Sequence, residues 1–383
     1  MKFMFTGKND SVYGALLIIK ATRVSILVTK FDAASNIPHL IWTHTESIRF
    51  DPSYSGPEML KRMESAILRA SLELDNRGVV VNAARLRCVI GAPWSHTVSR
   101  NIITSNEQPE RVTKRQLEDL AQIAEEQSLD FVSGQQFFNQ LGITPILKRN
   151  TGIKLNGYDV QEPIGLLAES ITIEHAISIA ETSLIAAVTE MHDKILPKSE
   201  LTFTTFNNDL QTCISQVLPQ YNSYATIELD TEVSTMSVFE GNTCRVSLYQ
   251  EFGYMDLVRA LTEISGLPKT EILGLLRTDI YALRETLSKS KKNKFTEILS
   301  DFSKSLNKLS LSIARETALP RDVILVSNLG APAFLINILC SDLGKVTGLE
   351  HFIQPLTSKF FKCEGAHVPI SDLAVAYTFN HER

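Results

Sequence analysis

Several features that assign proteins to familiar classes are scarce or missing in this 383-residue sequence. The longest early apolar run, Ala15 to Ile19, is far shorter than the roughly 20 residues that span a bilayer. No charged stretch followed by an apolar run and a small-residue cleavage site opens the chain. Lys and Arg number 38 against 43 Asp and Glu, so the net charge of −5 does not favour nucleic acid or an anionic membrane. We therefore expect a soluble, cytoplasmic protein.

Sequence patterns that mark metal sites and common hydrolases are missing as well. The five cysteines are never closer than 23 residues, which excludes a CxxC site and favours reduced, buried thiols. The eight histidines are scattered and form no HExxH pair. Neither GxSxG nor GxxxxGK[ST] occurs, so hydrolase and P-loop chemistry have no support. We expect no catalytic residue of these kinds and no bound metal.

The first part of the chain has the pattern of an α/β layered domain. With 44% hydrophobic and 21% charged residues the composition is that of a globular protein, and the length suits two to three domains of about 150 residues. Apolar periodicity predicts two strands joined by the turn Lys20-Ala21-Thr22-Arg23, a third strand, a helix and a fourth strand. These elements are Val12 to Ile19, Val24 to Phe31, His39 to Phe50, a helix from Gly56-Pro57 to Leu74, and Arg85 to Ala92.

The next stretch predicts a small α+β subdomain inserted over about residues 87–176. Thr113 and Gln116 form a capping box in front of a short helix. Short strands, separated by Gly, Asn and Pro turns, are predicted around it. They are His96 to Ile103, Ile143 to Leu147, Gly152 to Leu155 and Ile171 to Ile179.

A second cycle then repeats the opening order of strands, which predicts two α/β halves. A helix from about Glu181 to Lys194, a strand and another helix lead into it. Three strands are followed by a mostly helical stretch in which Lys289 to Lys294 reads as a basic bend between helices. The predicted elements are strands at Ser223 to Leu229, Thr235 to Phe239, Cys244 to Tyr249 and Val323 to Val326, and helices within Phe252 to Arg315, at Ala331 to Cys340 and at Leu373 to Tyr377.

Three local stretches resemble the bacterial actin-like proteins of the FtsA and PilM type. Val89 to His96, reading VIGAPWSH, is similar to the strand that enters the inserted subdomain of that family. Leu155 to Gly165 looks like the family's Asp-Gly-x-x-x-x-x-Pro-x-Gly segment, and Ile227 to Gly241 resembles the strand-turn-strand of its second phosphate loop. The resemblance implies a two-lobed actin-like (ribonuclease H-like) α/β fold with an SHS2-like α+β insert in the first lobe. The implied domains are 1–86 and 177–200 for the first lobe, 87–176 for the insert, and 201–383 for the second lobe with a helical subdomain at about 255–317.

In that fold ATP lies between the lobes, where glycines of two hairpin turns let backbone N–H groups approach the phosphates. The family's first turn reads Asp-x-Gly-Thr/Ser, whereas this chain has Ile18-Ile19-Lys20-Ala21-Thr22. The family's glycine-rich second turn becomes Glu228 to Thr235, without a glycine, and the two carboxylates Asp230 and Glu232 would repel phosphate. Of the glycines in the family's adenosine-side turn, this chain keeps only Gly330.

The positions that correspond to the nucleotide site are therefore degenerate, and we expect ATP and Mg to bind weakly or not at all and no hydrolysis to occur. They are Lys20, Thr22, Glu228, Asp230, Thr231, Glu232, Ser234, Thr235, Ser327, Asn328 and Gly330. Glu228, Asp230 and Glu232 share one face of a strand by its two-residue period, which fits either a cation-binding cluster or a solvated turn. We favour the solvated turn.

The resemblance leaves three functions to be compared. The first is a non-catalytic PilM-like scaffold that docks the cytoplasmic tail of a membrane protein in a type IV pilus or related machine, which would recruit it to the inner face of the membrane. The second is an FtsA-like division adaptor that forms filaments; FtsA ends in a linker and an amphipathic helix, whereas this chain stops at Arg383. The third is a nucleotide-dependent phosphotransferase, for which no phosphate glycines or catalytic carboxylate are found.

The scaffold hypothesis places the partner beside the insert. Its predicted strands, Ile143 to Leu147 and Gly152 to Leu155, offer edges to an extended peptide, since such peptides often bind along exposed strand edges. The apolar Phe137, Phe138 and Leu141 would line a groove there, or else form the insert's own small core. Both interpretations remain open at the level of sequence.

Overall fold

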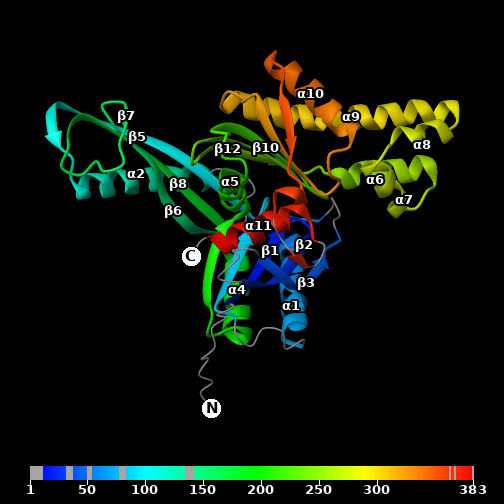
Figure 1. Cartoon of the computed structure of the whole chain (residues 1–383), viewed down its shortest axis with the longest axis horizontal. Helices are drawn as coiled ribbons and strands as arrows, with labels where there is room; N and C mark the ends of the chain where they lie inside the picture. Colours follow the sequence, from blue (N-terminus) through cyan, green and yellow to red (C-terminus); the bar gives the residue numbers. More distant parts are fainter. Residues whose placement is uncertain are drawn as a thin grey trace. The chain divides into compact units, whose positions relative to one another are not determined.

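The structure is a computed structural model that describes residues 12–31, 38–49, 54–76, 83–133, 142–361, 364–365 and 368–381 (Figure 1). The chain forms two compact units, each built from separate stretches of sequence. The first unit combines the chain up to Trp94 with Glu181–Leu218 and the part from Thr357 onward. The second combines Ser95–Ala180 with Pro219–Leu356.

A six-stranded sheet forms the centre of the first unit, in the order β15-β3-β2-β1-β4-β9. Helix α1 packs beside α4, and α5 beside α11, with the sheet between the two pairs (Figure 1). Residues 15–19 of β1 are fully buried, as expected for a strand with helices on both faces. The elements are β1 (Val12–Lys20), β2 (Arg23–Phe31), β3 (Pro38–Ser47), α1 (Gly56–Asn76), β4 (Arg85–Ile90), α4 (Thr182–Ile195), β9 (Glu200–Thr205), α5 (Phe206–Val217), a short 3-10 helix (Ser358–Phe360), β15 (Glu364–Gly365) and α11 (Ile370–His381).

A buried ion pair attaches α11 to the central sheet of the first unit. The Arg23 guanidinium on β2 donates to both carboxylate oxygens of Asp372, from Nη1 at 2.6 Å and from Nη2 at 2.8 Å. The Ser371 hydroxyl accepts a third hydrogen bond from Arg23 at 3.0 Å. The side chains of Arg23 and Asp372 are only 8% and 1% exposed, so each charge depends on the other for its solvation.

The second unit contains two sheets. The five-stranded sheet has the order β12-β11-β10-β13-β14, and the four-stranded sheet of the insert has the order β5-β8-β6-β7. The elements are β5 (Ser95–Arg111), α2 (Lys114–Ser133), β6 (Ile143–Leu155), β7 (Tyr158–Asp159), β8 (Leu167–Glu181), β10 (Ser223–Leu229), β11 (Ser234–Glu240), β12 (Thr243–Gln250), α6 (Tyr254–Ser265), α7 (Lys269–Arg277), α8 (Tyr281–Thr286), α9 (Lys289–Glu316), β13 (Asp322–Ser327), α10 (Ala333–Thr347) and β14 (Phe352–Pro355).

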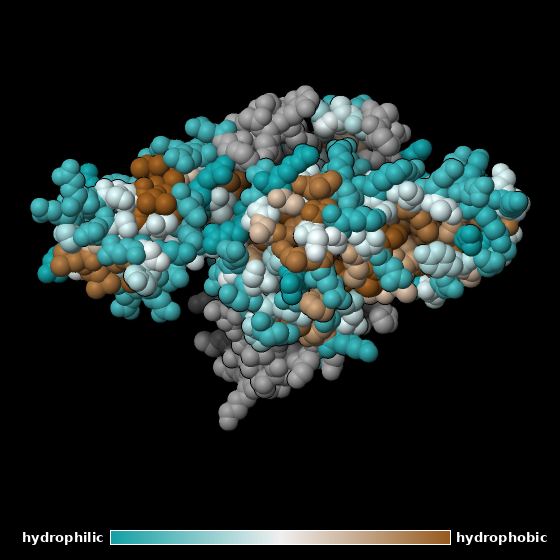
Figure 2. Space-filling view, turned by 90° about the horizontal axis from the view of Figure 1, so that it is seen from above, coloured by the Kyte–Doolittle hydropathy of each residue, from teal (hydrophilic) through white to brown (hydrophobic). Residues whose placement is uncertain are grey.

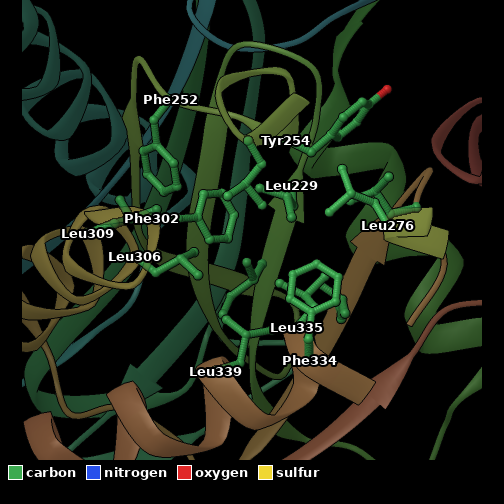
Figure 3. Packing of buried hydrophobic residues seen from close by; sticks show 14 of the residues in the cluster. Leu229, Phe252, Tyr254, Leu276, Phe302, Leu306, Leu309, Phe334, Leu335 and Leu339 are labelled. Atoms are coloured by element: carbon green, nitrogen blue, oxygen red, sulfur yellow. The ribbon is translucent and has the colours of Figure 1, made fainter. Parts of the chain in front are cut away.

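Helices α6 to α10 close an apolar core over the five-stranded sheet (Figure 3). Phe252 and Phe302 meet edge to face, with ring centroids 5.9 Å apart and planes at 78°. Leu306 and Leu309 of α9 and Leu335 of α10 extend the same cluster, each no more than 2% exposed. Phe302, Leu306 and Leu309 recur at three- and four-residue steps along α9, which is why the periodicity of the sequence predicts this helix.

Polar contacts join the insert to strand β12 within the second unit. Ser99 of β5 donates its hydroxyl hydrogen to the Cys244 carbonyl at 2.6 Å. Glu174 of β8 accepts hydrogen bonds from the Thr243 hydroxyl and the Arg245 guanidinium, both at 3.2 Å, and its carboxylate lies 3.4 Å from Lys154 Nζ. Burial alone would raise the pKa of Glu174, but the charges of Arg245 and Lys154 and these hydrogen bonds outweigh it and lower that pKa below its usual value.

Replacing Glu174 with glutamine should lower the free energy of unfolding of the second unit by about 1–3 kcal/mol at neutral pH. This loss is smaller than for a fully buried ion pair because the cations are partly exposed to solvent. A carboxylate whose pKa is lower in the folded protein stabilises the fold at pH values above its unfolded pKa of about 4.3. This stabilisation is lost as the pH falls through the folded pKa. In urea titrations at a series of pH values, the gap between wild type and variant should therefore close in acid. The control is Glu169→Gln on the same strand, where the side chain is exposed. A gap that stays constant with pH would contradict this account.

Several predicted elements differ from the structure. Residues 289–294 form no bend: they are the first turns of α9, which begins after its N-cap Ser288, because lysine favours a helix and extends its charge into solvent. The two short strands at 143–147 and 152–155 are one strand, β6. Gly152 fits inside it because a Cβ there would lie 3.1 Å from the Glu174 carboxylate, so the glycine permits a close approach and does not mark a turn.

The divisions between units also differ from the predicted boundaries. The insert's sheet begins at Ser95, its unit boundary falls after Ala180 and it groups with the second unit, whereas the sequence places it at 87–176 in the first lobe. The reason is that β4 continues to Ile90 and pairs in parallel with β1. Residues 201–218 and those from 357 onward, which the sequence assigns to the second lobe, lie in the first unit, because β9 pairs with β4 and α11 packs beside α5.

Two expectations about membranes and thiols can be compared with the described residues. None of the described helices combines the length and apolar character that a membrane crossing requires. Cys88, Cys213 and Cys244 are free and buried, which confirms the expectation for these three, while the free Cys340 is only half-buried. Cys363 lies outside the described residues.

Candidate functional site

The first candidate turn lies in the first unit, between β1 and β2. Lys20 pairs with Arg23, so the hairpin closes over two residues, Ala21 and Thr22. Neither has a positive φ, since Asn156 is the one non-glycine residue with a positive φ in the described part of the chain. The turn therefore lacks the left-handed backbone that glycine gives to a phosphate-binding loop.

The Lys20 side chain fills the space beside this turn. It is 2% exposed, and its Nζ lies 2.8 Å from the centroid of the Phe206 ring at the start of α5. A Cβ on Gly91 would lie 2.9 Å from Lys20 Cδ and 3.3 Å from Nζ, so a glycine at the end of β4 makes room for the lysine. The ammonium is thus held within the first unit by a cation–π contact.

The second candidate turn, residues 230–233, connects β10 and β11 in the second unit. Its carbonyl oxygens are bound by the N-terminus of α6: Tyr254 N donates to the Asp230 carbonyl at 3.1 Å, and Met255 N to the Thr231 carbonyl at 3.0 Å. The Ser234 hydroxyl donates to the Phe252 carbonyl at 2.8 Å. The first amides of a helix are the usual donors to a bound anion, and here the turn itself occupies two of them.

Gly253 is what allows α6 to approach the turn so closely. A Cβ at this position would lie 2.2 Å from the Thr231 carbonyl oxygen and 2.5 Å from that of Asp230. Both are backbone atoms held by the hydrogen bonds just described, so neither can rotate away. The close approach of two backbone carbonyls is therefore the steric reason for a glycine at the start of α6.

The carboxylates of the second turn are buried, so the prediction of a solvated turn is wrong. Glu228, Asp230 and Glu232 are each 7% exposed. Glu232 accepts a bidentate hydrogen bond from Arg259 of α6, at 2.6 and 2.7 Å, and Arg259 also donates to Asp256 at 2.6 Å. These hydrogen bonds raise the pKa of the Arg259 guanidinium, so Glu232 has a permanent cationic partner.

The cation-binding interpretation of these carboxylates finds no support in the described residues, which contain no group of three or more His, Cys, Asp or Glu that could hold a metal ion. Thr231 N instead donates to the Asp230 carboxylate at 2.8 Å. Arg259, Asp256, Gly91 and Phe206 complete the two turns, and the sequence analysis did not identify them as site residues. The available signal was the spacing Gly253-x-x-Asp256-x-x-Arg259, which places three residues on one side of α6.

The third candidate turn follows β13 in the second unit and keeps a glycine in the left-handed region of backbone conformation. Gly330 has a φ of +76°, and its N–H donates to the Ser327 carbonyl at 3.1 Å. Leu329 N donates to the Ser327 hydroxyl at 3.2 Å. Of the three turns, only this one retains the left-handed glycine backbone.

The structure brings the predicted residues together only in part. One hairpin contains Glu228, Asp230, Thr231, Glu232, Ser234 and Thr235. Ser327 ends the neighbouring strand β13, and Asn328 and Gly330 follow it. Lys20 and Thr22 belong to the other compact unit. The predicted partner-binding residues Phe137, Phe138 and Leu141 lie outside the described residues.

Comparison with known proteins rests on structure. No family model and no curated protein sequence matches this chain. Among solved structures, the PilM-PilN type IV pilus biogenesis complex contains a chain with a TM-score of 0.52 and 12% identity, covering 97% of both chains. An actin-like ATPase-fold protein of unknown function from Bacteroides thetaiotaomicron has a TM-score of 0.43 and 10% identity over 95% of both chains. The ethanolamine utilization protein EutJ from Carboxydothermus hydrogenoformans has a TM-score of 0.45 and 10% identity, covering 96% of this chain and 90% of its own.

The chain has the actin-like α/β fold, which confirms the fold predicted from the sequence, and a PilM-type protein is its structural relative. A fold does not fix function, so function has to be argued from the turns themselves.

Proposed function

We propose that this chain is a non-catalytic actin-like scaffold that docks a short segment of a membrane protein, as part of a type IV pilus or related assembly machine. The observation that carries the proposal is the second turn, where α6 binds the carbonyls of Asp230 and Thr231 and Arg259 holds Glu232. A phosphate loop needs exposed N–H groups and no local negative charge. This turn directs its carbonyls to its own helix and carries two carboxylates.

The first turn supports the same proposal. Lys20 stands where the family has the glycine that lets the backbone approach a phosphate, and its ammonium packs against Phe206. Releasing that ammonium toward a ligand would expose the ring face and the buried aliphatic stem, which costs free energy. With neither hairpin turn built for phosphate, we propose that ATP and Mg have no role in the protein.

The insert is the proposed docking surface for the partner. On its outer side, strand β6 pairs with β7 at Lys154 and Leu155, and the Ile153 carbonyl accepts a hydrogen bond from Val160 N; the described strands pair no further along this edge. Large apolar side chains are also exposed on the insert, and Figure 2 shows apolar patches on that part of the molecule. They are Ile103 (67%), Tyr158 (78%), Ile164 (60%) and Leu167 (59%). An open strand edge on a subdomain that also exposes apolar side chains suits an extended peptide.

The name of the solved relative suggests the kind of partner. The PilM-PilN complex pairs an actin-like protein with a second component of a pilus machine. By analogy, the partner here would be the cytoplasmic tail of a membrane protein, and that contact would hold this chain at the inner face of the membrane.

The test uses the full chain as bait on detergent-solubilised membranes of its native cell, followed by titration of the cytoplasmic tail of each recovered membrane protein as a synthetic peptide. The double variant Ile103→Asp and Leu167→Asp should lose the tail. The control Leu68→Asp changes a residue of α1 that is 60% exposed and should keep it. Equal binding of the tail by both variants would overturn the insert as the docking surface.

A further inference from the structure

The surface between α9 and α10 carries a concentration of positive charge that the proposed function does not use. Helix α9 contains seven basic and three acidic residues, although the chain as a whole has a net charge of −5. The basic residues are Lys289, Lys291, Lys292, Lys294, Lys304, Lys308 and Arg315. The last three lie beside a groove of about 470 Å³ between the two helices.

Four cations line this groove. Lys304, Lys308 and Arg315 face it from α9 because spacings of four and seven residues return to one side of a helix. Lys345 faces it from α10. Ser300, Asn307 and Ser312 add neutral hydrogen-bonding groups to the wall.

The single carboxylate in the groove is already neutralised. Asp342 is 2% exposed and accepts hydrogen bonds from the Ser303 hydroxyl at 2.6 Å and from Lys345 Nζ at 3.1 Å. Lys304 has an exposed ion pair with Asp301 at 2.8 Å. Lys308 and Arg315 are exposed and form no ion pair with any residue that the structure describes. The groove therefore presents unneutralised positive charge to solvent.

The geometry points to an extended acidic peptide as the ligand, and we propose that the α9–α10 groove binds such a segment of a partner protein. The cations are spread along the helix: the rise of 1.5 Å per residue places Lys304 and Arg315 roughly 16 Å apart along the axis. That distance matches about five residues of extended chain at ~3.3 Å each. A single phosphate would need cations that converge on one point, and a flat lipid surface would not enter a groove.

The groove is separate in sequence and structure from the insert, so this inference goes beyond the proposed function. The lining of the groove consists of charged, hydroxyl and amide side chains with one apolar residue, Leu311. Such a surface relies on charge pairing and hydroxyl contacts more than on apolar burial. We therefore expect the binding to weaken strongly with salt.

The experiment is fluorescence anisotropy with a labelled oligoglutamate peptide of about six residues, and an oligoglutamine peptide of equal length as the neutral control. Wild type should bind the acidic peptide and not the neutral one, with affinity falling as salt rises from about 50 to about 200 mM. The double variant Lys308→Glu and Arg315→Glu should lose affinity at least about tenfold. The milder pair Lys308→Gln and Arg315→Gln should show a smaller loss in the same direction.

A matched control separates the groove from charge in general. Lys291→Glu with Lys294→Glu makes the same charge change on exposed positions of the same helix, outside the groove, and should change the affinity by less than about twofold. Equal losses in both double variants, or no binding by wild type at low salt, would overturn the site. Vesicles containing phosphatidylserine form the last arm: binding to vesicles without binding to the peptide would assign the charge to a lipid surface and overturn the proposal.

Discussion

Replacing Gly253 with alanine is expected to destabilise the second unit by about 3–5 kcal/mol, through a backbone clash and the loss of hydrogen bonds at the start of α6. The added Cβ would lie 2.2 Å from the Thr231 carbonyl oxygen and 2.4 Å from its carbon. Relieving this contact means moving α6 away from the turn, which breaks the bonds from Tyr254 N and Met255 N. The φ of −155° suits any residue, so the effect is steric and owes nothing to backbone strain.

The measurement is denaturant unfolding followed by circular dichroism, together with hydrogen exchange of peptides from β10, β11 and α6. Gly274→Ala is the matched control, because Gly274 lies within α7 and a Cβ there meets nothing within 4 Å. The control should be neutral or stabilising by up to ~1 kcal/mol, since alanine is the better helix former. If Gly253→Ala behaves like the control, the close packing of α6 on the turn is wrong.

Replacing Asp372 with alanine should lower the stability of the first unit by about 3–5 kcal/mol, because it leaves the Arg23 guanidinium buried without its counterion. The pair is bidentate, and both side chains are nearly inaccessible to solvent. The double variant Arg23→Met and Asp372→Leu should recover much of the loss, since it removes both buried charges together.

Tryptophan fluorescence reports this transition selectively, because the two tryptophans, Trp42 and Trp94, both belong to the first unit. Glu190→Ala is the control: it breaks the Glu190–Lys194 ion pair of α4 in the same unit, in which the side chains are 68% and 70% exposed, and should cost less than ~1 kcal/mol. An Asp372→Ala protein as stable as this control would mean that α11 is not held by the ion pair.

The strands and long helices were predictable from sequence because their patterns are local. The opening hairpin, α1 and the capping box of Thr113 and Gln116 all follow from residues close in the chain, and the capping box forms as predicted, with bonds of 2.8 and 3.2 Å. The prediction of a bend at residues 289–294 was wrong because it rested on the charge of the lysines alone. The buried Phe295, next to Lys294, shows that this stretch already has an apolar side to pack.

The candidate site was less predictable, because its chemistry depends on partners distant in sequence. The loss of glycines at the first two turns is visible in the sequence, but the partners that replace a phosphate are not. Lys20 packs against a ring 186 positions away, and Glu232 is held by an arginine 27 positions away. The burial of Glu232 follows from that arginine, and a carboxylate without a known partner is reasonably assigned to solvent.

The central claim, that the turns of this actin-like chain are not built for nucleotide, is tested most directly by calorimetric titration of the purified full-length protein with Mg-ATP. The account predicts no measurable binding at millimolar nucleotide and no thermal stabilisation, because a true site at a hundredfold excess over its dissociation constant would add about 2.7 kcal/mol. A micromolar dissociation constant for Mg-ATP, with the matching rise in melting temperature, would contradict it.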